Sequence, residues 1–235
     1  MKWILLPGFD GTGKLFAPLL RVLPPEIEPV VVAYPCDRPT SVGDLVGIVL
    51  GSLPTNEPYV LIAESFSGPI GLKAASLHRN APAAIILCAS FVECPFNSSL
   101  VPIFTPFAAG LARIRPPHWM VRRYLLNDAK ADLVELFYAA IAAVSPRVLA
   151  NRFSSFSEFD ESFAPPGLYV PMLYLKAEDD RLVPSHNFGL VQQKYPHVKI
   201  ARIKSPHLIL QVRPEASIAA IIAFCLTARI KSLGR

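Results

Sequence analysis

The sequence has little of several features that mark other classes of protein. It contains four cysteines among 235 residues, with no C-x-x-C pair and no histidine at zinc-ligand spacing, so we predict neither disulfides nor a metal site. No apolar run reaches the roughly 18 residues that a membrane span needs. Pro7, Gly8 and Asp10 interrupt the first apolar stretch too early for a signal peptide. These absences favour a cytoplasmic protein.

Charge is also scarce. Charged residues make up 17% of the chain and hydrophobic residues 52%, which predicts a large core and a sparingly charged surface. The net charge of +5 is scattered and does not form the lysine and arginine stripe of a nucleic-acid-binding protein. The length fits one domain, and we expect no nucleic-acid partner.

Apolar segments typical of strands alternate with segments typical of helices. The predicted strands cover residues 3–6, 29–34, 59–63, 84–89, 172–176 and 199–203, and the predicted helices cover about 12–23, 41–53, 66–79, 185–194 and 214–230. Continuously apolar strands are typical of a parallel sheet with both faces covered. The alternation predicts an α/β fold with a mostly parallel central sheet and helices on both faces.

Ser65 lies between a predicted strand and a predicted helix. A serine at such a sharp turn presents its hydroxyl in the manner of a nucleophile elbow. The turn accepts only small neighbours: Ala63 and Ser67 satisfy that demand, and Gly68 lets the helix approach the sheet closely. The alternative role for a serine at this junction is a helix N-cap.

A candidate acid and a candidate base follow Ser65 along the chain. Asp180 and Asp179 stand just past the strand that ends near Ala177, where side chains point into the crevice of an open α/β sheet. We choose Asp180 as the acid and keep Asp179 as the alternative. His207 lies in the loop before the last helix. The order serine, aspartate, histidine is that of a hydrolase triad, in which the imidazole takes the serine proton and the carboxylate orients the imidazole.

A glycine-rich loop after the first strand supplies candidate oxyanion donors. Residues 7–13 read Pro-Gly-Phe-Asp-Gly-Thr-Gly, and glycines permit a tight loop whose backbone N–H groups face a ligand. We predict that the N–H groups of Phe9 and Phe66, the residue after the nucleophile, form an oxyanion hole. A turn that only caps a helix is the alternative for this loop.

With these motifs, the chain resembles the α/β-hydrolase superfamily almost from end to end. The matching segments are 6–9, 63–68, 177–184 and 207–215. Three features depart from the family pattern: Pro7 replaces a histidine, Ala63 and Ser67 replace glycines, and Gln211 replaces a frequent glutamate. The resemblance implies an α/β-hydrolase fold and a cofactor-free serine hydrolase acting on esters or thioesters.

The regular alternation stops where the family inserts its lid. We therefore divide the chain into a hydrolase core, residues 1–93 and 168–235, and a small helical lid, residues 94–167, with helical stretches at 119–127 and 129–143. The lid is rich in aromatic residues. Most of them would pack the lid onto the core, and the remainder would place an apolar acyl or alkyl group beside Ser65.

The lid also carries four arginines, at positions 113, 115, 122 and 123. Such residues most often form a solvated face, and otherwise they would attract an anionic carrier such as coenzyme A or an acyl carrier protein. The family includes a biotin-pathway carboxylesterase that acts on a carrier-bound methyl ester, and this chain is similar to it in size and in the position of its lid. The expected partner is thus a small ester or thioester, free or carrier-bound.

The predicted activity is hydrolysis through an acyl-enzyme, performed by a monomer or a homodimer. Other classes of function fit the same residues. One is acyl transfer to an alcohol or C–C bond hydrolysis on the same triad, and another is a catalytically silent binding protein, because fold alone does not prove activity.

Overall fold

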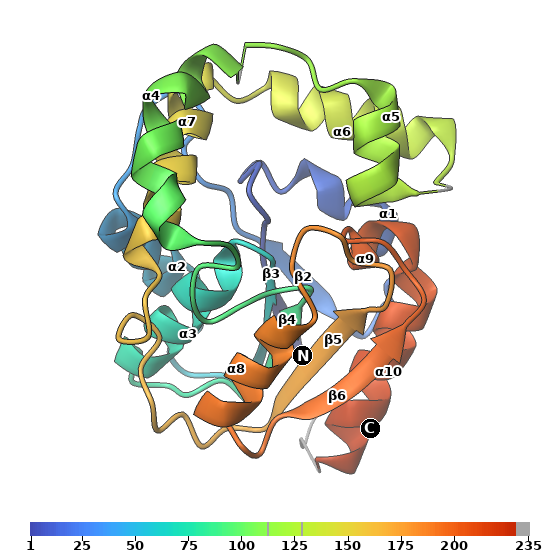
Figure 1. The fold of residues 1–235 in the computed structure, drawn as a ribbon. Coiled ribbons are helices and arrows are strands. Elements are labelled where there is room, and N and C mark those ends of the chain that lie inside the picture. The colour runs from blue at the N-terminus through green and yellow to red at the C-terminus, as the bar shows by residue number, and fades with distance from the viewer. Residues whose placement is uncertain (112, 128, 229–235) are drawn as a thin grey trace.

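The computed structural model describes residues 1–111, 113–127 and 129–228. Its centre is a six-stranded sheet in the order β2-β1-β3-β4-β5-β6, in which every neighbouring pair is parallel (Figure 1). The strands are β1 Lys2–Leu6, β2 Glu28–Val31, β3 Tyr59–Glu64, β4 Ala84–Cys88, β5 Met172–Ala177 and β6 Lys199–Ile203. The predicted fold class is confirmed.

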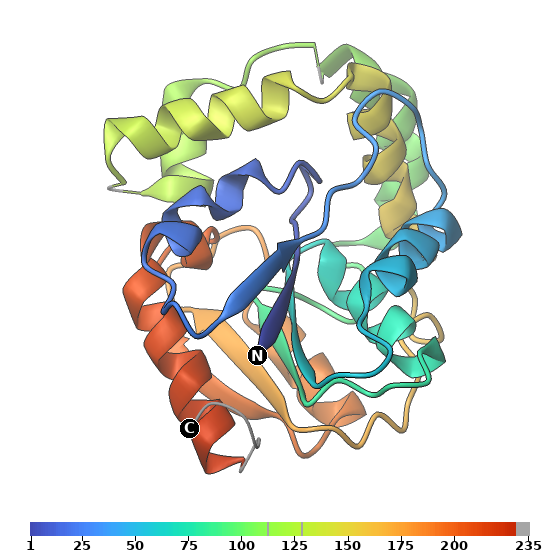
Figure 2. The ribbon, with the colours of Figure 1, turned by 180° about the vertical axis from the view of Figure 1, so that it is seen from behind.

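Helices cover both faces of the sheet, as Figures 1 and 2 show. One face packs on α2 (Val42–Ser52), α3 (Ser67–Leu77) and α8 (His186–Lys194), and the other packs on α1 (Ala17–Arg21), α9 (Ile209–Val212) and α10 (Pro214–Thr227). Central strands β3 and β4 are buried along their whole length, because helices exclude water from both sides.

Helix α3 lies unusually close to the sheet. A Cβ on Gly71 would stand 2.9 Å from Leu6 Cδ1 and 3.3 Å from the Cβ of Ala63, which is tighter than an ordinary side-chain contact. A Cβ on Gly68 would stand 1.8 Å from Ser90 Oγ. Glycine at these two positions therefore sets the distance at which the helix after Ser65 docks.

Two predicted elements near the N-terminus are wrong in extent. The helix predicted over 12–23 is a 3₁₀ turn, η1 (Lys14–Phe16), followed by the short α1. Gly13 has a φ of 71° at its start, and Pro24 and Pro25 follow its end. The strand predicted to reach Tyr34 stops at Val31. The Tyr34 N–H donates to the carbonyl of Gly11 at 2.8 Å and not to a neighbouring strand.

The predicted last helix is present as α10, which is described up to Thr227, while residues 229 and 230 of that prediction lie outside the described residues. The one-turn helix α9 precedes it and was not predicted. Among the described residues, no single helix has the length and apolar character of a membrane span, and α6 with the segment after it reaches that standard only as a pair bent by 89°.

The segment between β4 and β5 is more helical than predicted. It contains η2 (Ser98–Leu100), α4 (Val101–Leu111), α5 (His118–Val121), the π-helical turn η3 (Arg122–Leu126), α6 (Ala131–Ala142), α7 (Pro146–Ser154) and η4 (Ser155–Glu158). Helices α4 and α7 were missed because prolines stand inside one and at the start of the other. Pro146 occupies the first turn, where a proline is tolerated, and Ser145 caps the helix.

Helices α4, α5, α6 and α7 lie together across the carboxyl ends of the strands in both views (Figures 1 and 2). Ser65, Asp180 and His207 all follow carboxyl ends of strands, which is where open α/β sheets bind ligands. The fold thus encloses these residues between the sheet and the helices above it.

Candidate active site

Ser65 occupies the sharp turn between β3 and α3. Its φ is 47°, a left-handed conformation that non-glycine residues rarely adopt and that costs of order 1–3 kcal/mol. Two backbone bonds hold the turn: the Ser65 N–H donates to Cys88 O at 2.9 Å, and the Gly68 N–H donates to Ser65 O at 3.0 Å. The strained turn is thereby fixed from both sides.

His207 links Ser65 to Asp180. Its Nε2 lies 2.9 Å from Ser65 Oγ, and its Nδ1 lies 2.8 Å from Asp180 Oδ2. The second oxygen of Asp180 accepts the N–H groups of Leu182 and Val183 at 2.8 and 3.0 Å. The carboxylate against His207 is therefore that of Asp180, the residue we chose, rather than that of Asp179.

The imidazole of His207 is buried. Burial alone would lower the pKa of His207, but the adjacent Asp180 carboxylate, assisted by Glu64, outweighs it and raises that pKa above the ordinary value. A carboxylate at Nδ1 also favours the tautomer that leaves Nε2 free to accept a proton. The arrangement can thus move a proton from the Ser65 hydroxyl to His207.

The two predicted oxyanion residues lie side by side. The rings of Phe9 and Phe66 meet edge to face with centroids 5.9 Å apart. Within the described part of the chain, neither backbone N–H donates a hydrogen bond to a protein acceptor. Both donors are thus available to a bound oxygen. The loop that carries Phe9 is closed by a bond of 3.0 Å from the Gly11 N–H to Gly8 O.

Two departures from the family pattern, Ser67 and Pro7, contact each other. The Ser67 hydroxyl donates to the carbonyl of Pro7 and lies 2.7 Å from the buried hydroxyl of Tyr34. A serine in place of glycine therefore links the turn at Ser65 to the loop that carries Phe9. Sequence reasoning missed this link, since the two residues stand 60 positions apart.

A further carboxyl group lies buried among these elements. Glu64, the last residue of β3, accepts a bond from Gln211 Nε2 at 3.1 Å, and the Gly8 N–H also faces its carboxylate. Burial, opposed mainly by His207, raises the pKa of Glu64 to about 7. Glu64 Oε1 and Gln211 Oε1 have no hydrogen-bond partner among the described residues. The sequence signal was an acid inside an apolar strand, and it was overlooked.

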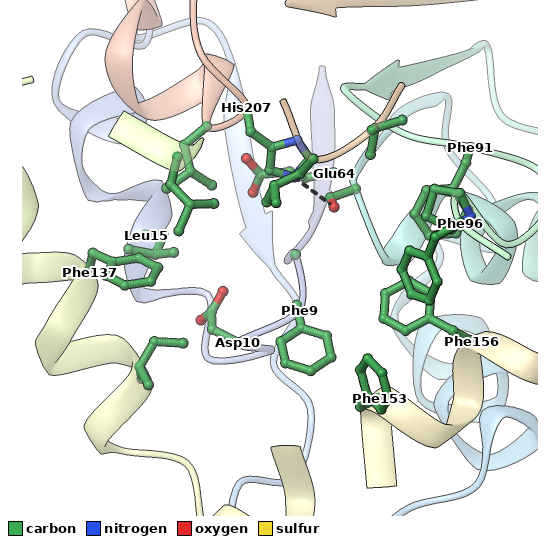
Figure 3. A pocket seen from close by; sticks show the side chains of 18 residues that line it. Phe9, Asp10, Leu15, Glu64, Phe91, Phe96, Phe137, Phe153, Phe156 and His207 are labelled. Carbon is green, nitrogen blue, oxygen red and sulfur yellow. Dashed lines mark hydrogen bonds between the residues drawn. The ribbon is translucent and has the colours of Figure 1, made fainter. Parts of the chain in front are cut away.

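An apolar cavity of about 310 Å³ opens at Ser65 and His207, a size within the usual range for ligand pockets. Figure 3 shows four aromatic side chains, Phe91, Phe96, Phe153 and Phe156, gathered on one side. Leu15 and Phe137 lie on the opposite side, and the dashed line marks the hydrogen bond between Ser65 Oγ and His207 Nε2. Ser65 and His207 thus border a cavity whose lining is mainly apolar.

The described residues contain no cluster of three or more histidine, cysteine, aspartate or glutamate side chains suited to a metal ion. Two of the lid arginines have partners within the chain. Arg122 donates to the carbonyls of Asn127 and Ala129 at 3.3 and 3.1 Å, and the Arg115 guanidinium lies 3.9 Å from the centre of the Tyr138 ring. These contacts give both side chains a role in holding the lid together.

Comparison with known proteins supports the fold at several levels. The model of the alpha/beta hydrolase family matches residues 3–220. A protein of Azorhizobium caulinodans, named provisionally as carbamate hydrolase RutD, is 28% identical over 112 residues, which cover 47% of this chain and only 40% of that protein.

Solved structures share the architecture at low sequence identity. The esterase EaEST from Exiguobacterium antarcticum has a TM-score of 0.79 at 12% identity, with 99% of this chain and 92% of that chain covered. An esterase from Thermogutta terrifontis has a TM-score of 0.78 at 20% identity, with 97% and 90% covered. From the family match over most of its length, this chain belongs to the alpha/beta hydrolase family.

Proposed function

We propose that the protein is a serine hydrolase that cleaves carboxylic esters or thioesters with an apolar acyl group through an acyl-enzyme intermediate. The observation that carries this proposal is the continuous chain of hydrogen bonds from Asp180 through His207 to Ser65 at the mouth of an apolar cavity. A serine hydroxyl needs such a base to attack a carbonyl at neutral pH.

The proposed reaction has two halves. Ser65 Oγ attacks the carbonyl carbon while its proton passes to His207 Nε2, and the N–H groups of Phe9 and Phe66 bind the resulting oxyanion. His207 then gives the proton to the leaving alcohol or thiol as the bond to it breaks. Water, deprotonated by His207, attacks the acyl-enzyme, and the proton returns to Ser65 as the carboxylic acid leaves.

The walls of the cavity support an apolar acyl group. A second apolar cavity of about 500 Å³ shares Phe9, Ile141 and Phe153 with the first. The two cavities are therefore neighbours beneath the lid helices, and an acyl chain too long for the first would continue into the second. Burial of each methylene is worth about 0.8 kcal/mol, which favours a medium or long chain over acetate.

The relatives give consistent but coarser support. EaEST and the Thermogutta terrifontis protein are esterases by name, and RutD is named as a carbamate hydrolase. All three names describe hydrolysis, and an ester, a thioester and a carbamate each present a carbonyl to a nucleophile. A carrier-bound substrate stays a prediction, since Arg122 and Arg115 also have partners within the lid.

The proposal is tested by labelling with a fluorophosphonate probe, followed by peptide mass mapping and by stopped-flow hydrolysis of p-nitrophenyl esters. We expect one adduct on Ser65 and a burst of p-nitrophenol equal to the enzyme concentration. Ser65→Ala should lose both, whereas Ser76→Ala, an exposed serine of α3, should keep both. Hydrolysis that persists in Ser65→Ala would reject Ser65 as the nucleophile.

A further inference from the structure

A buried arginine from the lid binds the loop that carries Phe9. Arg152 belongs to α7 and is only 2% exposed. Its Nη1 donates to Phe9 O at 3.0 Å and also to Asp10 O, and its Nη2 donates to Pro35 O at 2.8 Å. One guanidinium thus holds two consecutive carbonyls of the oxyanion loop and a third from the segment after β2.

The loop is shaped to receive this cation. Gly11 has a φ of 68°, and a Cβ there would stand 2.6 Å from guanidinium atoms of Arg152. A side chain at Gly11 would therefore displace the arginine. The planar guanidinium offers five donors in a rigid fork, which suits three carbonyls better than the single ammonium of a lysine would.

Arg152 has no ion pair with any described carboxylate. The carboxylate that acts on its charge is that of Asp10, which accepts the backbone N–H of Thr12 at 2.8 Å and the Thr12 hydroxyl. A buried charge is costly unless hydrogen bonds satisfy it. The carbonyls of the oxyanion loop supply those bonds, so the arginine and the loop stabilise each other.

The bonds constrain the candidate oxyanion donor. Each peptide unit is planar, so fixing the carbonyls of Phe9 and Asp10 fixes the two peptide planes that follow the Phe9 N–H. The bond from Gly11 to Gly8 O closes the loop on the other side. The Gly11 N–H shares its peptide plane with the Asp10 carbonyl, and the Phe9 N–H shares its plane with the Gly8 carbonyl, so these bonds connect Arg152 to the plane that holds the Phe9 N–H.

We propose that Arg152 is a positioning residue of the oxyanion hole, and that docking of α7 on the core brings the Phe9 N–H into its productive direction. The inference rests on the proposed function, since it assigns the Phe9 N–H to a developing oxyanion. It gives the lid a second task besides enclosing substrate: the lid completes the machinery that stabilises the transition state.

Kinetics of Arg152→Met and Arg152→Lys test the proposal, with Arg147→Met, an exposed arginine of the same helix, as the matched control. A misdirected donor lowers the stabilisation of the transition state and leaves the affinity for the substrate unchanged. Removal of one oxyanion donor costs about 10²- to 10³-fold, and a misdirected donor should cost about 10- to 100-fold in kcat, with KM within about threefold of wild type. The kcat of Arg152→Lys should lie between those of Arg152→Met and the wild-type protein, and the kcat of Arg147→Met should equal the wild-type value.

A pair of inhibitors separates positioning from simple support of the fold. An alkyl trifluoromethyl ketone adds to Ser65 and places an oxyanion in the hole, whereas the matching methyl ketone only fills the cavity. In Arg152→Met we expect the affinity for the trifluoromethyl ketone to fall in parallel with kcat. The affinity for the methyl ketone should stay unchanged. Equal loss for both ketones, or an unchanged kcat, would overturn the role of Arg152.

Thermal unfolding of each variant shows whether it is folded at the assay temperature. If Arg152→Met does not fold, the same two ketones are compared in Arg152→Lys, whose charge remains but whose fork is lost. The failures of the two proposals are distinct. Absence of a Ser65 adduct in the wild-type protein would reject the serine hydrolase itself, whereas an adduct together with unchanged ketone affinities in the folded variant would reject only the positioning role.

Discussion

The two sides of the cavity are built by different forces. On the side of Ser65 and His207, hydrogen bonds of 2.8 and 2.9 Å fix the groups against one another, and the surrounding loops belong to the core. Away from these groups, the phenylalanine cluster of Figure 3 packs through ring contacts, such as the 4.9 Å centroid distance between Phe96 and Phe156. Hydrogen bonds require direction, whereas aromatic packing tolerates shifts.

This difference suggests a division of labour. In the proposed reaction, the polar side sets the chemistry, because a proton transfer fails when donor and acceptor are misplaced. The aromatic side sets which acyl groups fit in that reaction, because its shape follows the size of a few side chains. Arg152 connects the two sides, since it comes from the lid and binds the loop that carries Phe9.

The largest expected effect concerns the orientation of His207. Asp180→Asn would keep the shape but present an amide to Nδ1, which favours the wrong imidazole tautomer and should lower kcat about 10⁴-fold. Asp179→Asn is the matched control, because Asp179 stands beside Asp180 in the chain and the hydrogen bond to His207 Nδ1 is made by Asp180. Steady-state hydrolysis of a p-nitrophenyl ester measures both. Similar losses of kcat in the two variants would show that the orientation of His207 does not depend on the Asp180 carboxylate alone.

The buried Glu64 offers a second test of the polar side, this time through stability. Burial raises its pKa from 4.5 to about 7. A raised pKa means that folding favours the protonated form of Glu64. The contribution of this protonated form to the stability of the folded protein is therefore complete below pH 4.5 and is lost as the pH rises through about 7. Glu64→Gln removes the titration and keeps the hydrogen-bonding shape.

We therefore expect Glu64→Gln to have nearly wild-type stability at pH 4.5. Towards pH 8 its free energy of unfolding should exceed that of the wild-type protein, by about 3 kcal/mol at most. Urea unfolding at both pH values measures the difference. Gln211→Leu serves as a comparison, because it removes the amide that bonds Glu64 and leaves the carboxyl in place. A stability difference that is the same at both pH values would contradict a titrating Glu64.

The polar side was the more predictable one. Ser65, Asp180 and His207 could be identified because each stands just after a strand, and the sheet brings the ends of its strands together. Their neighbours could not, since Ser67 with Pro7 and Arg152 with Phe9 are pairs separated by 60 and 143 positions. The family pattern marks Pro7 and Ser67 as departures but does not show that they meet, and the only sequence signal of the Arg152 contact is the glycine at position 11.

The lid was less predictable for a local reason. Helix α4 contains Pro106, and α7 begins with Pro146, so the prolines indicated loops where helices form. The helical stretch predicted over residues 119–127, by contrast, is present as α5 and the π-turn Arg122–Leu126. The boundaries of the lid at 94 and 167, the cytoplasmic location and the oligomeric state stay predictions.

The smallest expected effect tests how the neighbouring cavities select the acyl chain and leaves the chemistry in place. Ile141 of α6 lines both cavities, and Ile141→Trp should narrow the passage between them. Because each methylene excluded from the second cavity forfeits about 0.8 kcal/mol, hydrolysis of p-nitrophenyl dodecanoate should fall about tenfold or more. Butyrate, which needs only the first cavity, should be hydrolysed within about twofold of the wild-type rate. Glu135→Trp places the same ring on the exposed side of α6 and controls for its bulk. An equal loss for both chain lengths would mean that the acyl chain does not enter the second cavity, and that this cavity does not select among substrates.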